Sequence, residues 1–200
     1  MPLILILGII LFSLSSLYFL IKPKPGLNSP FLVSITTLVS YILMLEGTFL
    51  IGNSDTGLYW TRWLFYGVSC PLLIYEISNQ LGLKTKETFA NIFLTALVMI
   101  TGVLSSITVG NFKLAFFAIS CVVFGKVLYS VFTSKSDQLA RIVPYMLFGW
   151  SVFPIVFILS FEGYGLIENP LAAGIYLALD LFTKIIFYIH YSAKSKTEEK

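Results

Sequence analysis

Charged residues are scarce in this chain of 200 residues. Asp, Glu, Lys and Arg make up only 12% of it, 57% of its residues are hydrophobic, and its mean hydropathy is +0.88. Soluble domains carry about 25% charged residues, so the composition excludes an ordinary soluble domain and predicts a membrane protein. The apolar runs are about 20 residues long and do not alternate with polar residues, which favours membrane helices over barrel strands.

Cysteine and histidine are also rare. Cys70 and Cys121 both lie inside apolar stretches, which argues against a structural disulfide. The sequence contains no cluster with metal-ligand spacing, no nucleotide-binding loop and no nucleic-acid-binding patch. We therefore expect no metal site and no nucleic-acid partner.

The apolar runs predict an all-α membrane protein built as a bundle of seven transmembrane helices. Turn-rich or charged segments separate the runs, and Asn28, Ser29 and Pro30 form a favourable start for the second helix. Pro154 lies within the sixth run, where proline bends a helix and frees a carbonyl group. The predicted spans are residues 3–21, 30–51, 58–81, 88–108, 112–133, 138–161 and 167–191.

The basic residues predict how the bundle is oriented. Nine of the thirteen lie in or beside the loops after the first, third and fifth spans and in the C-terminal tail. Lys113 is alone in the opposite loops, together with Asp55, Glu162 and Glu168. Because cytoplasmic loops are enriched in Lys and Arg, we expect the N-terminus outside the cell and the C-terminus in the cytoplasm.

The seventh span carries two opposite charges in its middle. Asp180 and Lys184 are four residues apart, so both lie on one helix face. A charge at the bilayer centre costs at least ~2.5–3.5 kcal/mol, so the presence of two charges in this span calls for a structural or functional explanation. One interpretation is a structural ion pair that stabilises the bundle; the other is a lysine kept for chemistry, such as a Schiff base, with Asp180 as its counterion.

The third span is the most polar, and four of its residues share one face. Arg62, Phe65, Ser69 and Glu76 follow one another at helical spacing, with Glu76 ~16 Å beyond Phe65 along the axis. With the predicted orientation, this stripe places a cation outside, an apolar side chain next, a hydroxyl at mid-membrane and an acid near the inner surface.

At these residues the chain resembles the microbial rhodopsins. On the third span the resemblance rests on Trp60-Thr61-Arg62, followed by Tyr66, Ser69, Cys70 and Pro71. The sixth span fits the family's aromatic and proline pattern, and Asp180 with Lys184 fits its last helix. The resemblance implies all-trans-retinal bound covalently to Lys184, with Asp180 as counterion. It implies a retinal pocket formed by Tyr66, Met99, Gly102, Phe117, Ser120, Cys121, Trp150, Phe153, Pro154 and Phe157.

Departures from the common family pattern narrow the resemblance to the schizorhodopsins. Outward proton pumps have a carboxylate where this chain has Phe65, and phenylalanine cannot accept a proton. Phe65, Ser69 and Glu76, with Cys70 beside Ser69, resemble the schizorhodopsin pattern. This implies a light-driven inward proton pump whose proton pathway involves Glu76, Ser69, Cys70, Arg62 and Phe65.

Three other functions remain open at this stage. A photosensor would signal through a separate membrane partner, since no signalling domain is recognisable in this sequence. A light-driven anion pump also lacks the acid on the third span, but it needs a halide where Asp180 already provides the counterion. A seven-helix carrier of a small solute would use no retinal.

The remaining predictions concern organisation and surroundings. We expect a retinal-binding domain over residues 1–193, a polar cytoplasmic tail over 194–200 and a multi-pass location in the cell membrane. The lipid bilayer is the expected partner, the resemblance implies a homotrimer, and protons are the only expected soluble substrate. Glu46, Lys126 and His190 receive no role.

Overall fold

The computed structural model describes residues 1–23, 26–48, 50–51 and 58–195 of the chain. Lys24, the whole predicted loop 52–57 and the end of the predicted tail, residues 196–200, lie outside the described residues. The side chain of Trp60 is also outside the description.

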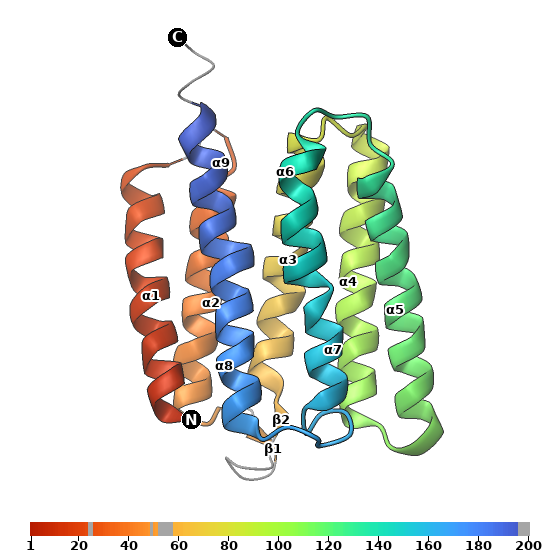
Figure 1. The fold of residues 1–200 in the computed structure, drawn as a ribbon. Helices are drawn as coiled ribbons and strands as arrows, with labels where there is room; N and C mark the ends of the chain where they lie inside the picture. The colour runs from red at the N-terminus through yellow and green to blue at the C-terminus, as the bar shows by residue number, and fades with distance from the viewer. Residues whose placement is uncertain (24–25, 49, 52–57, 196–200) are drawn as a thin grey trace.

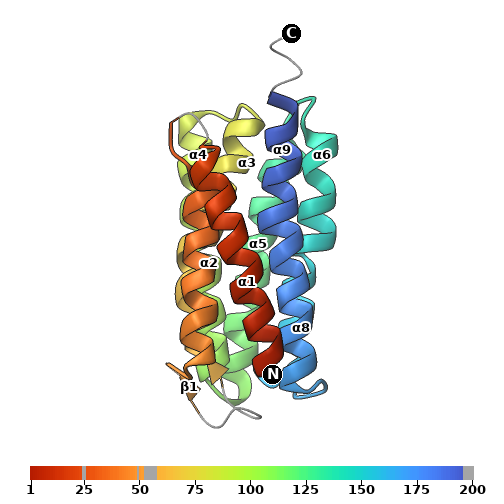
Figure 2. The same ribbon diagram turned by 90° about the vertical axis from the view of Figure 1, so that its left-hand side faces the viewer.

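Seven helical columns form one ring, which confirms the predicted all-α fold. Each column packs against the next one in sequence, and α8 closes the ring against α1. Figures 1 and 2 show the columns side by side, with the start of the first column and the end of the seventh at opposite ends of the bundle. The first five columns are α1 (Pro2–Ile21), α2 (Ser29–Leu45), α3 (Trp60–Gln80), α4 (Thr85–Ile107) and α5 (Gly110–Phe132).

The last two columns are each interrupted by a wider π-helical turn. The sixth consists of α6 (Leu139–Pro144), η1 (Tyr145–Trp150) and α7 (Val152–Leu159). The seventh consists of α8 (Asn169–Asp180), η2 (Leu181–Ile186) and α9 (Phe187–Ser195). η1 and η2 contact each other, and π-helical turns often occur at functional sites.

The interruption of the sixth column begins before the proline that was expected to cause it. The Ser151 N–H donates to the carbonyl of Met146, a longer step than the α-helical bond. Pro154 follows in α7 and has no N–H to donate to the preceding turn. The departure from regular α-helical hydrogen bonding therefore extends from η1 into the start of α7.

The second helix is shorter than predicted. It begins as expected, with Asn28 capping the N–H of Phe31 at 3.4 Å. However, it ends at Leu45 instead of continuing to residue 51, because the chain turns at Gly47 with φ +69°. Beyond this turn Leu50–Ile51 (β1) pairs antiparallel with Leu58–Tyr59 (β2), a two-residue ladder that the sequence did not indicate.

The bundle is apolar outside and carries its polar groups inside. Large hydrophobic side chains such as Phe93, Phe112 and Val122 are 68–74% exposed, which suits contact with lipid tails. Among the described residues, five helical segments are long and apolar enough to cross a membrane: Pro2–Ile21, Thr85–Ile107, Gly110–Phe132, Leu139–Leu159 and Asn169–Tyr191. Arg62, Glu76, Asp180 and Lys184 are instead at most 9% exposed. Charged groups placed in this way point to a polar interior that serves function.

We predict that Gly149 is required for close packing of the two π-helical turns. A Cβ on Gly149 would lie 2.3 Å from Cγ2 of Thr183, so Gly149→Ala forces the two columns apart. Overpacking of this kind costs about 1–3 kcal/mol. The midpoint of thermal unfolding in detergent, followed by helical circular dichroism, should fall. Gly125→Ala is the matched control, because a Cβ there meets nothing within 4 Å; equal midpoints for both variants would contradict the prediction.

Candidate functional site

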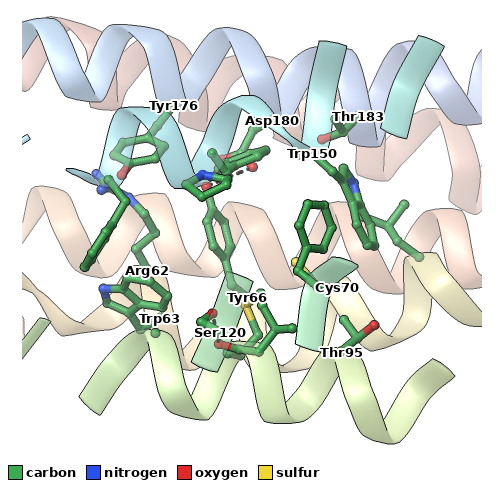
Figure 3. Close-up of a pocket in the computed structure, with 18 of the residues that line it drawn as sticks. Arg62, Trp63, Tyr66, Cys70, Thr95, Ser120, Trp150, Tyr176, Asp180 and Thr183 are labelled. Carbon is green, nitrogen blue, oxygen red and sulfur yellow. Dashed lines mark hydrogen bonds between the residues drawn. The ribbon is translucent and has the colours of Figure 1, made fainter. Parts of the chain in front are cut away.

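A cavity lies between the third, fourth, fifth, sixth and seventh columns. Figure 3 shows side chains from opposite columns converging on it. All ten residues predicted for the retinal pocket line this cavity. Its lining also includes Arg62, Trp63, Cys70, Leu73, Thr95, Val98, Phe124, Glu162, Tyr176, Asp180, Thr183 and Lys184.

Aromatic rings form much of the cavity wall. The rings of Phe117 and Phe157 stack at 5.5 Å, and Trp63 meets Phe157 edge-on at 5.6 Å. Gly102 makes room for Trp63, since a Cβ at Gly102 would lie 2.5 Å from the indole ring. The wall is thus rigid and shaped for a flat apolar molecule.

The ion pair predicted from the seventh span is formed inside this cavity. Lys184 Nζ lies 2.8 Å from Asp180 Oδ1, and their side chains are only 2% and 3% exposed. Asp180 ends α8 and Lys184 lies within η2, so the change from α- to π-helix falls between them. Removing one partner of a buried ion pair costs about 3–5 kcal/mol, so the two groups depend on each other.

Two tyrosines complete the surroundings of Asp180. The hydroxyl of Tyr41, from α2, lies 3.1 Å from Oδ2. The hydroxyl of Tyr66, from α3, lies 3.1 Å from both carboxylate oxygens. The centre of the Tyr66 ring lies 4.3 Å from Lys184 Nζ. Figure 3 shows Tyr66 reaching across the cavity toward Asp180. An ionised carboxylate only accepts hydrogen bonds, and here it faces an ammonium group and two hydroxyl donors.

A second group of charges lies at the end of the cavity nearest the N-terminus. Arg62 Nη1 forms an ion pair with Glu162 Oε1 at 3.4 Å, and its guanidinium lies 4.1 Å from the ring centre of Tyr176. Trp63 Nε1 donates to Glu162 Oε2 at 2.9 Å, and Lys113 Nζ donates to the Glu162 carbonyl at 2.7 Å. Burial raises the pKa of Glu162 above its ordinary value, although Arg62, Trp63 and Lys113 oppose the shift.

Glu76 lies at the other end of the bundle and is 3% exposed. Its Oε2 accepts from Ser29 Oγ at 2.8 Å, and its Oε1 accepts from Gln80 Nε2 at 2.7 Å. Leu73 lies on the same helix between Glu76 and the cavity, where it joins both the lining and the main hydrophobic cluster. Glu76 is therefore separated from the cavity by an apolar layer.

The other predicted pathway residues occupy different environments. Ser69 is fully buried and its Oγ has no hydrogen-bond partner among the described residues. Cys70 lines the cavity. Phe65 is half-buried and lies outside the cavity lining. The residues of the predicted stripe on the third span therefore lie in different environments and do not form one continuous wall of the cavity.

The three residues left without a role lie away from the cavity. Glu46 and Lys126 are exposed. His190 is also exposed, and its Nδ1 lies 2.9 Å from the hydroxyl of Tyr145.

Several site residues were missed from the sequence. Tyr176 lies one helical turn before Asp180, so its helical spacing was a usable signal. Glu162 was recognised only as a loop acid, and nothing in its local sequence indicated a partner on α3. Tyr41, Ser29 and Gln80 depend on contacts between helices or on the end of a helix, which periodicity does not reveal.

The residues present suit retinal. Lys184 supplies an amine at the wall of an apolar, largely aromatic cavity, and no hydrogen bond to its Nζ besides the ionic contact is found among the described residues. A Schiff base at Nζ would remain beside Asp180, so its positive charge would be balanced.

Comparison with known proteins agrees with this geometry. A family model described as bacteriorhodopsin-like protein matches residues 1–193. The structure of schizorhodopsin 4 superposes with a TM-score of 0.89 at 38% sequence identity, covering 95% of this chain and 97% of that one.

Curated relatives give the same assignment. Bacteriorhodopsin of Halobacterium salinarum is 27% identical over 210 residues, covering 92% of this chain and 79% of the relative. Sensory rhodopsin-2 of Haloarcula vallismortis is 26% identical over 162 residues, covering 75% and 69%. Proteins of this family are light-driven ion transporters or photoreceptors and not classical enzymes, and they bind retinal through a lysine Schiff base in the membrane. The chain belongs to the bacteriorhodopsin-like family of microbial rhodopsins.

Proposed function

We propose that this protein is a light-driven inward proton pump that releases protons to the cytoplasm. The observation that carries the proposal is the unequal placement of acids along α3. Phe65 follows Arg62 by about one turn on the outer side, where it can take no proton, whereas Glu76 is a buried carboxylate on the inner side. The similarity to schizorhodopsin 4 supports this proposal.

The orientation used here is also part of the proposal. The α1–α2, α3–α4 and α5–α6 connections lie at the end of the bundle where α9 ends, and the α4–α5 connection lies at the other end (Figure 1). Lys22, Lys84, Lys86 and Lys135 lie in or beside the first three connections, and Lys113 lies beside the fourth. The excess of basic residues favours the cytoplasm at the C-terminal end. We keep the homotrimer as a proposal drawn from the resemblance, and residues 1–193 as the retinal-binding domain.

Lys184 holds the cofactor and Asp180 balances its charge in the dark. Bound retinal supplies light absorption and an isomerisation that turns the Schiff-base N–H. Tyr41 and Tyr66 hold the Asp180 carboxylate by hydrogen bonds of 3.1 Å, so the counterion keeps its position when the N–H turns away. In this proposal Asp180 acts as a fixed anion on the outer side of the Schiff base.

Glu76 gives the released proton its direction. It lies two helical turns, about 10 Å, beyond Ser69 along α3. At this distance and an effective dielectric constant of about 20, the Glu76 carboxylate attracts a proton at the level of Ser69 by about 1.7 kcal/mol. This attraction is almost three times the thermal energy of about 0.6 kcal/mol, so it is enough to favour the inner exit.

Buried hydroxyls supply polar positions on the way inward. Ser69 and Thr95 are at most 3% exposed, and their hydroxyl oxygens have no hydrogen-bond partner among the described residues. Buried polar groups of this kind usually bind water. We infer that water at these hydroxyls and at Cys70 passes the proton toward Glu76.

The Schiff base regains its proton from the outer side of the membrane. Glu162 and Tyr176 hold Arg62 at the outer end of the cavity. Asp180 therefore pairs with Lys184 and with the hydroxyls of Tyr41 and Tyr66. Protons from outside then reach the Schiff base past Arg62 and Asp180. Phe65 supplies no group to trap a proton on this side.

A photosensor is the second candidate function, because sensory rhodopsin-2 is among the relatives. It would show the same pigment without net proton transport. An anion pump would instead respond to halide, while Asp180 already occupies the counterion position beside Lys184.

Illumination of retinal-supplied cells that produce this protein should make the medium alkaline, and a protonophore should abolish the change. Glu76→Gln should keep the colour but reduce the initial rate about 10-fold or more, because about 1.7 kcal/mol of attraction is lost. Glu46→Gln is the matched control, since Glu46 is exposed and lies outside the cavity. Acidification of the medium would contradict the inward direction, and an unchanged rate in Glu76→Gln would remove Glu76 from the mechanism.

Asp180→Asn should abolish the visible absorption band at neutral pH. Without the carboxylate the protonated Schiff base becomes an unpaired buried cation, a loss of about 3–5 kcal/mol, so the Schiff base loses its proton and absorbs in the near ultraviolet. Absorption spectra of the purified pigment test this. Glu162→Gln also removes an ion-paired carboxylate but should remain coloured. A visible band of unchanged strength in Asp180→Asn would mean that another group is the counterion.

A further inference from the structure

We propose that Ser29 and Gln80 are positioning residues for inward proton release, forming a clamp that holds the Glu76 carboxylate in place. We call these two side chains the Glu76 clamp. The inference rests on the proposed function, which assigns Glu76 its role but names nothing that positions it.

The clamp contacts both oxygens of one carboxylate. Ser29 Oγ donates to Oε2 at 2.8 Å and Gln80 Nε2 donates to Oε1 at 2.7 Å. Hydrogen bonds from neutral donors to a carboxylate are stronger than those between neutral groups. Because each oxygen has its own donor, the carboxylate can neither rotate nor turn toward solvent without losing a bond.

The two donors come from different parts of the fold. Gln80 is the last residue of α3, one helical turn after Glu76, and is half-buried at the cytoplasmic end in the proposed orientation. Ser29 is the first residue of α2 and is fully buried. The clamp therefore connects the end of α3 to the beginning of α2.

The turn between α1 and α2 fixes Ser29. Asn28 Nδ2 donates to the carbonyl of Phe19 at 3.0 Å, and Asn28 Oδ1 accepts from the N–H of Phe31. These bonds tie the start of α2 to the end of α1. The start of a helix also carries partial positive charge, so this position favours an anion at Glu76 as well as supplying the hydroxyl.

The seventh column closes the surroundings of the carboxylate. Tyr188 of α9 is buried near Glu76 and Ser29, and its hydroxyl has no hydrogen-bond partner among the described residues. Its ring meets Phe19 edge-on at 5.9 Å, which places α1, α2, α3 and α9 around one acid. An acid that served only to snorkel to the membrane surface would not need this enclosure. The arrangement keeps a negative charge at one fixed depth, where it attracts the proton that leaves the Schiff base.

Single substitutions separate this role from simple packing. Ser29→Ala and Gln80→Leu each remove one donor, while Ser29→Thr keeps the hydroxyl. Ser34→Ala is the matched control, because Ser34 is also fully buried on α2 but its hydroxyl pairs with Ser15 at 2.9 Å. All variants are studied as full-length, retinal-bound protein.

We expect Ser29→Ala and Gln80→Leu to lower the initial pumping rate about 3- to 10-fold, the effect of one hydrogen bond to a charged group. Ser29→Thr should restore most of the rate, Ser34→Ala should retain it, and the visible band should stay in place. Combined with Glu76→Gln, Ser29→Ala should cause no further loss, since the two act through the same carboxylate. Wild-type rates in both clamp variants, or losses that multiply with that of Glu76→Gln, would overturn the proposal.

Infrared spectroscopy in the dark tests the clamp independently of transport. The carboxylate stretching band of Glu76, identified by its absence in Glu76→Gln, should shift in Ser29→Ala and Gln80→Leu but not in Ser34→Ala. If the wild type proved to move no protons inward, the proposed function would fail while this band shift still tested the clamp. An unshifted band in both clamp variants would overturn the clamp itself, whatever the direction of transport.

Discussion

The buried ion pair between Asp180 and Lys184 is the constraint on which the site depends. At 2.8 Å and almost without solvent, neither charge is stable without the other. The surrounding helices supply what the pair needs: Tyr41 from α2 and Tyr66 from α3 bind the carboxylate, and aromatic rings surround the lysine. A lysine held in this way is available to form a Schiff base whose charge is already balanced, which suits the retinal chemistry of this family.

In the proposed function and orientation, the direction of transport follows from how charges are distributed on either side of this pair. On the outer side Arg62 is bound to Glu162, and Phe65 offers no acceptor. On the inner side a single carboxylate, Glu76, is enclosed by the start of α2 and the end of α3. We propose that the ion pair is the common centre, and that the acids at the two ends of the bundle determine the direction in which a released proton moves.

Much of this arrangement could be predicted from the sequence, because the bilayer imposes simple rules. Long apolar runs predicted the helices, and the spacing of Asp180 and Lys184 predicted that these two side chains lie on one helix face. The resemblance to the microbial rhodopsins indicated ten residues that line the cavity. The end of α2 was misjudged, since Gly47 stops the helix through a positive φ that hydropathy does not register. Tyr41, Glu162 and Ser29 were missed because their roles arise from contacts between distant segments, which no local pattern encodes.

The most direct test of the account is the photocurrent of the protein in a voltage-clamped cell, at zero voltage and equal pH on both sides. The account predicts an inward current on illumination that persists when chloride is replaced by an impermeant anion. An outward current would contradict the assigned direction, and a current that disappears with chloride would show that an anion and not a proton is carried. A coloured protein without current would contradict the pump and favour a sensor.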